Sequence, residues 1–410
     1  MSASILRNNI PFRRTVAAIG ANQLSDAMSY ITIPLLVLAL TNSVELSSLT
    51  IFLVNISGII FNIFSGVIVD KGSPYKTLAF SCIAQSIMWG IVSVLILNNI
   101  KSIFIMIVSL ITIAIVSQLD YPSENSIIVD TVPQESLGEA SALGQARESA
   151  ANIIGGPLAG FISGISIFLA VFLQSIINLV AFFVSPKRSK KQQDCYKNTE
   201  GSILLDFRKG YTYILKRKTL IAITMVGCIA NFSTTGIPLV FIYYYNSIGI
   251  STLQIGVFAS SFGIGVIVGS LIVGYLTQKY TLSLLGSIAI FAIFIGQVCV
   301  SITYSNFWLT CIVFIASGVP LPSLNASIVS YVNASTPSDI IGRVHSAMGI
   351  PNMILMPLGS LFAGFLFIYL GVQLSVLFFS IFTFVSLFFM LSQKTLRTIP
   401  NIKDVEKYYD

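Results

Sequence analysis

The 410-residue chain contains few charged residues. Asp, Glu, Lys and Arg make up only 10% of it, while 55% of its residues are hydrophobic. Soluble globular domains carry about 25% charged residues, so this chain could not cover a surface exposed to water. The composition excludes a soluble globular protein and predicts a protein that crosses a membrane several times.

Residue types that carry catalysis or bind metals are also scarce. The single histidine, His345, is expected near the membrane surface, whereas a membrane-embedded transferase would need a His/Asp or Cys pair at depth. The five cysteines have no metal-ligand spacing and are expected to be small apolar packing residues. The sequence also lacks a Walker-type Gly-x-x-x-x-Gly-Lys-Ser/Thr motif. We therefore expect no enzyme activity, no metal site and no cofactor.

Long apolar segments dominate what the chain does contain. Segments of about 20 apolar residues cross a bilayer as helices, because lipid offers the backbone no hydrogen-bond partners. The sequence contains twelve such segments: 15–40, 48–69, 76–97, 102–125, 138–163, 167–185, 218–245, 252–277, 281–303, 308–332, 342–366 and 370–391. They predict an all-α protein with twelve transmembrane helices.

The basic residues predict the orientation of these helices. The net charge of +7 could indicate a nucleic-acid partner, but nearly all Lys and Arg residues fall between alternate apolar segments, which indicates membrane topology instead. Both termini and the basic segment 186–217 are therefore expected in the cytoplasm, with the protein in the plasma (inner) membrane. The predicted organisation is a six-helix bundle at 1–185, a cytoplasmic linker at 186–217, a second bundle at 218–393 and a tail at 394–410.

One stretch of the sequence occurs twice. Residues 122–129 read Pro-Ser-Glu-Asn-Ser-Ile-Ile-Val, and residues 322–329 read Pro-Ser-Leu-Asn-Ala-Ser-Ile-Val. A second proline, Pro157 or Pro357, follows the first one after 35 residues in both copies. The common offset predicts two pseudo-symmetric halves, each with the same helix–loop–helix hairpin.

A short loop motif connects this organisation to a known family. Residues 66–71, Gly-Val-Ile-Val-Asp-Lys, match the signature Gly-x-x-x-Asp-Arg/Lys, and residues 274–279 form a weaker copy. With six helices, a basic linker and six more helices, the chain resembles the major facilitator superfamily. We expect Asp70 to face Arg343 at the start of the eleventh helix, where the helix end favours a carboxylate. The gating motif is then Gly66, Asp70, Lys71 and Arg343.

Charged residues inside the apolar segments are candidates for function, because each costs a few kcal/mol unless it is paired or hydrated. Asp26 follows Arg14 by 12 residues, which places it about 18 Å into the membrane at 1.5 Å per residue. Desolvation favours the neutral form of a carboxyl group, so Asp26 is the candidate proton carrier, although a purely structural Asp is the alternative. In the resembled superfamily, helices one, four, seven and ten line the central cavity. The predicted cavity residues are Asp26, Asn22, Gln23, Asn231 and Asn325.

A second group of charged residues lies in the fourth and fifth segments. Asp120 and Glu124 are four residues apart and share one helix face, and Arg147 enters the next helix to a similar depth. Glu148 joins this cluster in sequence but points about 100° away from Arg147. The cluster is either a structural clamp that closes the cytoplasmic gate or a site for a substrate cation or a proton.

The fifth segment contains a second motif. Residues 155–160, Gly-Gly-Pro-Leu-Ala-Gly, resemble the Gly-Pro-x-x-Gly-Gly signature of drug–proton antiporters at Gly156, Pro157 and Gly160. Close packing of small residues is the alternative explanation. Together with the first helix and the loop at 66–71, this motif is similar to the macrolide-efflux and siderophore-exporter branch.

These observations predict a monomeric secondary transporter that exports an amphipathic small molecule, such as a drug, an antibiotic or a siderophore-like product, in exchange for protons. The alternative within transport is an importer of a sugar or an organic anion. An organic-anion importer should place Arg or Lys at mid-cavity, and the second half has none there. A non-transporting assembly protein, in contrast, would tolerate the loss of every intramembrane charge.

Overall fold

The computed structural model describes residues 9–100, 102–187, 211–337, 340–397 and 399. These residues form helices joined by short turns, and no strand occurs among them. Much of the predicted linker and tail, residues 188–210 and 400–410, lies outside the described residues. The chain divides into two compact units, Met1–Glu200 with Ile250–Ser260, and Gly201–Gly249 with Ser261–Asp410.

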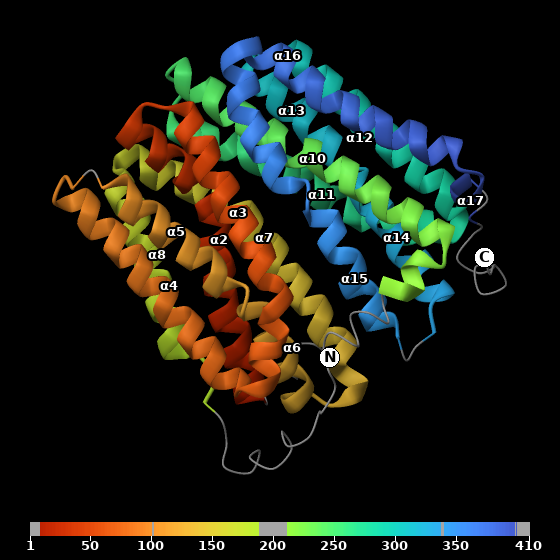
Figure 1. The fold of residues 1–410 in the computed structure, drawn as a ribbon, viewed down its shortest axis with the longest axis horizontal. Coiled ribbons are helices and arrows are strands. Elements are labelled where there is room, and N and C mark those ends of the chain that lie inside the picture. The colour runs from red at the N-terminus through yellow and green to blue at the C-terminus, as the bar shows by residue number, and fades with distance from the viewer. Residues whose placement is uncertain (1–8, 101, 188–210, 338–339, 398, 400–410) are drawn as a thin grey trace. The chain divides into compact units, whose positions relative to one another are not determined.

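The first unit is built around helix α2, which packs against α3, α7 and α8 (Figure 1). Asn9 caps α2 by accepting a hydrogen bond from the Phe12 backbone N–H. The helices of this unit are α2 (Ile10–Thr41), α3 (Val44–Lys71), α4 (Pro74–Leu97), α5 (Ile103–Ser117), α6 (Asp120–Thr131), α7 (Leu137–Ile165) and α8 (Ile167–Val184), with a short 3₁₀ turn, η1 (Gln134–Ser136), before α7.

The second unit is organised around the pairing of α10 with α16, while α12 packs against α14 and α16. Phe232 of α10 lies against Phe362, Phe379 and Phe382 of α16, so aromatic contacts fix this pair. The helices assigned to this region are α10 (Lys218–Ser247), α11 (Thr252–Lys279), α12 (Leu282–Thr303), α13 (Phe307–Gly318), α14 (Leu321–Ser335), α15 (Ile341–Met353), α16 (Met356–Ser392) and α17 (Lys394–Arg397). The first residues of α11 group with the first unit.

The repeated prolines interrupt one helix in each unit. Pro122 lacks the N–H that would bond to the residue four positions earlier, and the helix breaks there into α5 and α6. The corresponding break separates α13 from α14 just before Pro322. Pro157 lies inside the continuous α7, whereas Pro357 is the second residue of α16, after a break.

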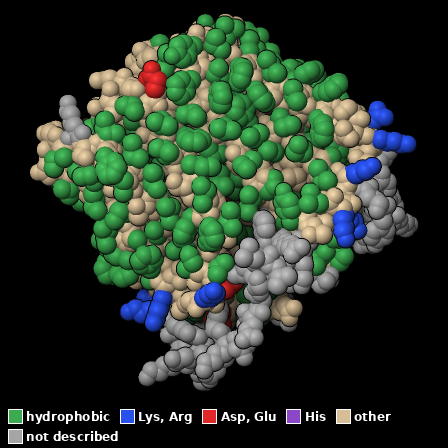
Figure 2. All heavy atoms as spheres, viewed as in Figure 1, with side chains coloured by type: hydrophobic (Ala, Val, Ile, Leu, Met, Phe, Trp, Pro, Cys, Tyr) green, Lys and Arg blue, Asp and Glu red, His purple; other side chains and the backbone are tan. Residues whose placement is uncertain are grey.

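Ten helical spans in the described part of the chain are long and apolar enough to cross a membrane. Figure 2 shows hydrophobic side chains over most of the visible face. The twelve segments predicted from the sequence differ from these ten spans in two places. Small, polar and charged residues keep α7 out of this set, and the last two segments fall in one span, Ala347–Ser392. Within it, Gly371 has a φ of 72° and kinks α16 near the start of the last predicted segment. The prediction of an all-α membrane protein is confirmed.

Candidate functional site

A buried ion pair links three helices of the first unit. Arg147 Nη1 lies 2.7 Å from Glu124 Oε1, and their side chains are only 11% and 6% exposed. Arg147 Nη2 donates to Glu124 Oε2 at 2.9 Å, so the contact is bidentate. Arg147 Nε also donates to Gln23 Oε1 at 2.8 Å. Arg147 of α7 therefore binds both α6, through Glu124, and α2, through Gln23.

Asp120 belongs to a separate set of contacts. Asp120 Oδ2 accepts hydrogen bonds from Asn22 Nδ2 at 2.9 Å and from Gln85 Nε2 at 3.1 Å. Asn22 and Gln85 are fully buried, and Asp120 is 8% exposed. Asn22 was predicted to line an open cavity, but it lies inside this network. Because both contacts come from uncharged amides, the described residues give Asp120 no cationic partner.

The other two carboxylates of the predicted sets lie apart from these contacts. Glu148 is exposed, whereas Arg147 beside it in the sequence is largely covered. Asp26 lies one turn beyond Asn22 on α2 and is partly exposed. No hydrogen bond or ion pair to the Asp26 carboxylate occurs among the described residues. Asp26 and Glu148 are therefore both accessible, and of the two Asp26 lies on α2 beside the network around Asn22.

Polar residues that the sequence analysis did not select hold α2 in place. Asn178 Nδ2 donates to Ser25 Oγ, and Ser29 Oγ donates to Gln174 Oε1, both at 2.8 Å. Gln174 and Asn178 of α8 are fully buried. The sequence could have identified them, because each is an Asn or Gln within an apolar segment. A buried amide needs hydrogen-bond partners, so such a residue is expected to contact a neighbouring helix. The same signal would have identified Gln85.

The second unit contains a cavity of about 350 Å³ with an uncharged polar lining. It includes the predicted residues Asn231 and Asn325 and also Asn352, which was not among the predicted cavity residues. Asn231 Nδ2 donates to the backbone oxygen of Asn352 at 2.9 Å, which joins α10 to α15. Asn352 Oδ1 is buried and has no hydrogen-bond partner among the described residues. The described lining contains no Asp, Glu, Lys or Arg, but it includes His345, whose Nε2 lies 2.7 Å from Asn333 Oδ1.

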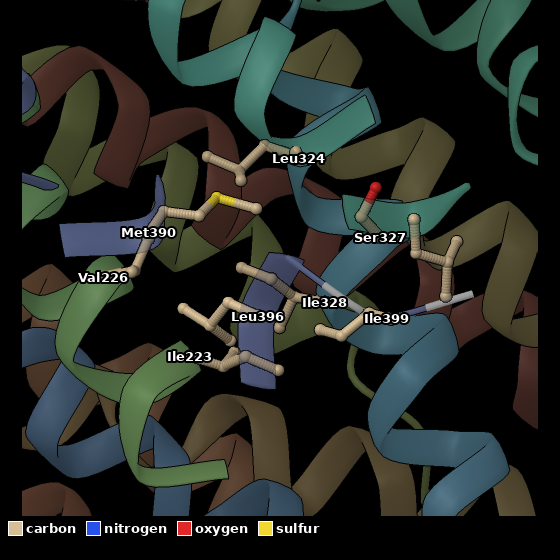
Figure 3. Close-up of a pocket in the computed structure, with 10 residues that line it drawn as sticks. Ile223, Val226, Leu324, Ser327, Ile328, Met390, Leu396 and Ile399 are labelled. Carbon is tan, nitrogen blue, oxygen red and sulfur yellow. The ribbon is translucent and has the colours of Figure 1, made fainter. Parts of the chain in front are cut away.

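A smaller space in the same unit is a packing void. Figure 3 shows side chains of α10, α14, α16 and α17 around it, including Leu324, Met390 and Leu396. Its volume is about 20 Å³ and its lining is almost entirely apolar. A polar ligand would find no partners there, so this void is not a candidate site.

The gating residues Gly66, Asp70 and Lys71 occupy the end of α3, where Asp70 is exposed. The Gly72 N–H ends the helix by donating to the backbone oxygens of Ile68 and Val69. Arg343 lies in α15, but its side chain is outside the part of the chain that is described. The contact between Asp70 and Arg343 therefore stays a prediction.

The glycine motif of α7 lies where helices approach closely. A methyl group added at Gly155 would lie 2.5 Å from the Ala27 Cβ of α2. A methyl group at Gly156 would clash with Ser260, and one at Gly160 would clash with the Thr252 backbone oxygen, both in the part of α11 that groups with this unit. Pro157 lies between them without breaking α7. Small-residue packing is therefore part of this motif's role.

No group of three or more His, Cys, Asp or Glu residues that could hold a metal ion occurs among the described residues.

The family model described as Major Facilitator Superfamily matches residues 15–279 and 223–407. An uncharacterized MFS-type transporter, YkuC of Bacillus subtilis (strain 168), is 26% identical over 299 residues, which cover 66% of this chain and 68% of YkuC.

Solved structures share the fold at low sequence identity. A bacterial homolog of the human lysosomal transporter Spinster, inward-facing and unoccupied, matches with a TM-score of 0.72 and 14% identity, over 95% of this chain and 96% of that one. The nucleoside transporter NupG matches with a TM-score of 0.72 and 13% identity, over 93% of this chain and 100% of that one. Identities this low carry information about the fold alone.

Proposed function

The chain belongs to the Major Facilitator Superfamily and is a secondary transporter, and we propose that it exports an amphipathic small molecule in exchange for protons. In such proteins a substrate site opens alternately to the two sides of the membrane as the halves rearrange. The proposal assigns substrate binding to the cavity of the second unit and proton coupling to Asp26 of the first unit.

The observation that carries the proposal is the lining of the cavity of about 350 Å³. Apolar residues such as Ile293 and Met348 alternate there with the amides of Asn231, Asn325 and Asn352. A mixed lining of this kind fits a molecule with an apolar body and a few hydrogen-bonding groups. The described lining contains His345 but no Lys or Arg, which disfavours an organic anion because an anion would need a permanently charged partner.

Proton coupling is assigned to Asp26 because its carboxylate is free to change partners. Glu124 is held by Arg147 at 2.7 Å, and Asp120 is held by two amides. Asp26 is partly exposed and has no such contact among the described residues. A carboxyl group in a membrane takes up a proton readily when no cation offsets its charge. Protonation of Asp26 would alternate with substrate binding.

The direction of transport is proposed from the resemblance of residues 155–160 to the antiporter signature.

The membrane is proposed to be the plasma membrane, with both termini in the cytoplasm and the protein acting as a monomer. Cysteines placed at Glu45 and Lys76, both exposed and near opposite ends of α3, test the orientation. In a cysteine-free background, an impermeant reagent should label the first position from outside and the second only from the cytoplasm. The reverse pattern would contradict the orientation.

Transport in inside-out membrane vesicles tests the function. An acidic lumen should drive accumulation of amphipathic fluorescent compounds, and collapse of the pH gradient should release them. Asp26→Asn should abolish accumulation against a gradient but retain binding and downhill exchange, because Asn mimics the protonated state. Glu45→Gln changes an exposed carboxylate and is the matched control. Normal accumulation by Asp26→Asn would remove Asp26 from the coupling step.

A second candidate is an importer of an uncharged, hydroxyl-rich metabolite such as a sugar. The three asparagines in the cavity favour it, since amides bind hydroxyl groups well. Labelled sugars in right-side-out vesicles with an acidic exterior distinguish the two candidates. Proton-driven sugar uptake without export of any amphipathic compound would establish the importer.

A further inference from the structure

The interruption between α5 and α6 places a buried carboxylate at a helix end. α5 ends at Ser117, and α6 begins with Asp120. Asp120 is the first residue of α6, where the free N–H groups of a helix N-terminus attract a carboxylate. Interrupted membrane helices provide ion sites in other transporters, because the break exposes polar groups inside the protein.

The hydrogen bonds around Gln85 determine the orientation of its amide. Ser81 Oγ donates its hydrogen to the Val116 backbone oxygen at 3.0 Å, so it can only accept from Gln85. Gln85 Nε2 makes this bond at 3.0 Å and gives its other hydrogen to Asp120 Oδ2 at 3.1 Å. The Gln85 nitrogen is therefore fully used, and its oxygen is left over.

Asn22 is oriented in a similar way. Its Nδ2 donates to Asp120 Oδ2 at 2.9 Å and contacts Cys82 Sγ at 3.4 Å. Four buried oxygen atoms then remain without a hydrogen-bond partner among the described residues: Asn22 Oδ1, Gln85 Oε1, Asp120 Oδ1 and Ser123 Oγ. The two amide oxygens lie within about 5 Å of Asp120 Oδ2, since each is bonded through one carbon to a nitrogen that contacts it. Asn22, Gln85 and Ser123 are fully buried.

The charges around these oxygens favour a single positive charge. Arg147 neutralises Glu124 through the bidentate contact, so it is not available to Asp120. Asp26 lies one turn further along α2 and makes none of these contacts, although its charge interacts with that of Asp120. One carboxylate with amide and hydroxyl oxygens gives a hard, oxygen-only site with one negative charge. A divalent ion such as Ca²⁺ usually requires more carboxylates. A proton on Asp120 would supply one donor for several unsatisfied oxygens, whereas a metal cation is shared by all of them.

We propose that Asp120, Asn22 and Gln85, with Ser123, bind one alkali-metal cation at the α5–α6 interruption, with Na⁺ as the ion to test. The cation would neutralise Asp120 and lock α2, α4 and α6 together. The proposal rests on contacts inside the first unit and is independent of the transported compound and of its direction.

Equilibrium binding of Na⁺ to the purified full-length protein tests the site. Thermal unfolding is followed while NaCl replaces choline chloride at constant ionic strength, without substrate and without a gradient. A bound cation should raise the midpoint in a saturable way, because a ligand of the folded state stabilises it by mass action. Binding of radioactive Na⁺ should reach one ion per protein. A midpoint that is the same in Na⁺ and choline, with no bound ion, would overturn the proposal.

Two variants and a control connect the effect to these side chains. Asp120→Asn should weaken Na⁺ binding by about 50-fold, as expected for loss of a charged ligand. Gln85→Met keeps the charge and most of the volume, removes one ligand oxygen, and should weaken binding by about 10-fold. Asp130→Asn changes a partly exposed carboxylate of the same helix α6 and should bind Na⁺ like the wild type.

The Na⁺ affinities of these variants also decide whether the ion binds at Asp120. Wild-type Na⁺ affinity in Asp120→Asn would place the ion elsewhere and overturn the site. If Asp120→Asn does not fold, wild-type affinity in Gln85→Met would overturn it instead. Loss of Na⁺ binding with intact proton-driven export would leave the proposed function unaffected, so the two proposals fail separately.

Discussion

The two units contain the same repeat but differ in charge. At an offset of 200 residues, Asp120, Glu124 and Arg147 of the first unit correspond to Pro320, Leu324 and Ala347 of the second. Leu324 and Ala347 are buried, as Glu124 is, and the Arg147 side chain is only 11% exposed. The positions of the charged network in one unit are therefore apolar in the other.

The helix interruptions persist despite this difference. α5 and α6 are separated near Pro122, and α13 and α14 are separated near Pro322. An interruption by proline depends on the backbone, so it tolerates any change in the neighbouring side chains. The backbone design is thus shared, while the side chains give the first unit a network of charges and the second unit an uncharged cavity.

Among substitutions that remove the charged network of the first unit, the largest loss of stability is expected at Arg147. Arg147→Ala leaves the buried Glu124 without its cation and should destabilise the protein by about 3 kcal/mol. The midpoint of thermal unfolding in detergent measures it. Glu124→Gln combined with Arg147→Ala removes both charges and should recover part of the loss. A double variant whose loss equals the sum of the single losses would show that the two residues are not coupled.

The next effect concerns the loop motif, in which Asp70 of the first unit corresponds to Gln278 in the weaker copy. Asp70→Asn should preserve folding, because Asp70 is exposed. It should slow the change between inward-open and outward-open states by about 10-fold, since one charge-assisted contact made in only one state is lost. Single-molecule fluorescence on labelled protein gives the rate. Unchanged rates and unchanged state populations would exclude a gating role.

Much of the helical framework could be predicted from the sequence. The apolar segments and the repeated prolines are local features, and both units contain helices close to the predicted ranges. Boundaries were less predictable where proline or Gly371 divides an apolar segment, because hydropathy does not register a backbone kink.

The candidate site was predicted only in part. Residue spacing placed Glu124 and Arg147 at a similar depth on two helices, and they form an ion pair, but it also grouped Asp120 with them, which the structure places in separate contacts. It could not reveal that Asn22 and Gln85 bind Asp120, because these residues lie on three different helices. Contacts between distant helices depend on tertiary packing, which a single sequence does not specify.

A smaller effect is expected in the uncharged cavity, at Asn325. This side chain is exposed and lines the cavity, so Asn325→Ala should change the free energy of unfolding by less than about 0.5 kcal/mol. The transported compound should bind about 5-fold more weakly if it accepts or donates one hydrogen bond there. Val329→Ala changes an apolar residue of the same lining and is the control. Equal affinities in wild type and Asn325→Ala would exclude contact with the substrate.

The smallest effect is expected at Glu148, which tests where the charged network of the first unit ends. Glu148 and Arg147 are neighbours in the sequence, but α7 turns them about 100° apart. Arg147 is largely covered and paired with Glu124, while Glu148 is exposed. An exposed carboxylate is already solvated and gains little from a partner, so Glu148→Gln should change thermal stability by less than about 0.5 kcal/mol and leave proton-driven transport unchanged. Both quantities can be measured beside Arg147→Ala in one preparation series. A loss of coupling in Glu148→Gln would extend the network to the exposed face of α7 and make Glu148 a second proton-binding residue beside Asp26.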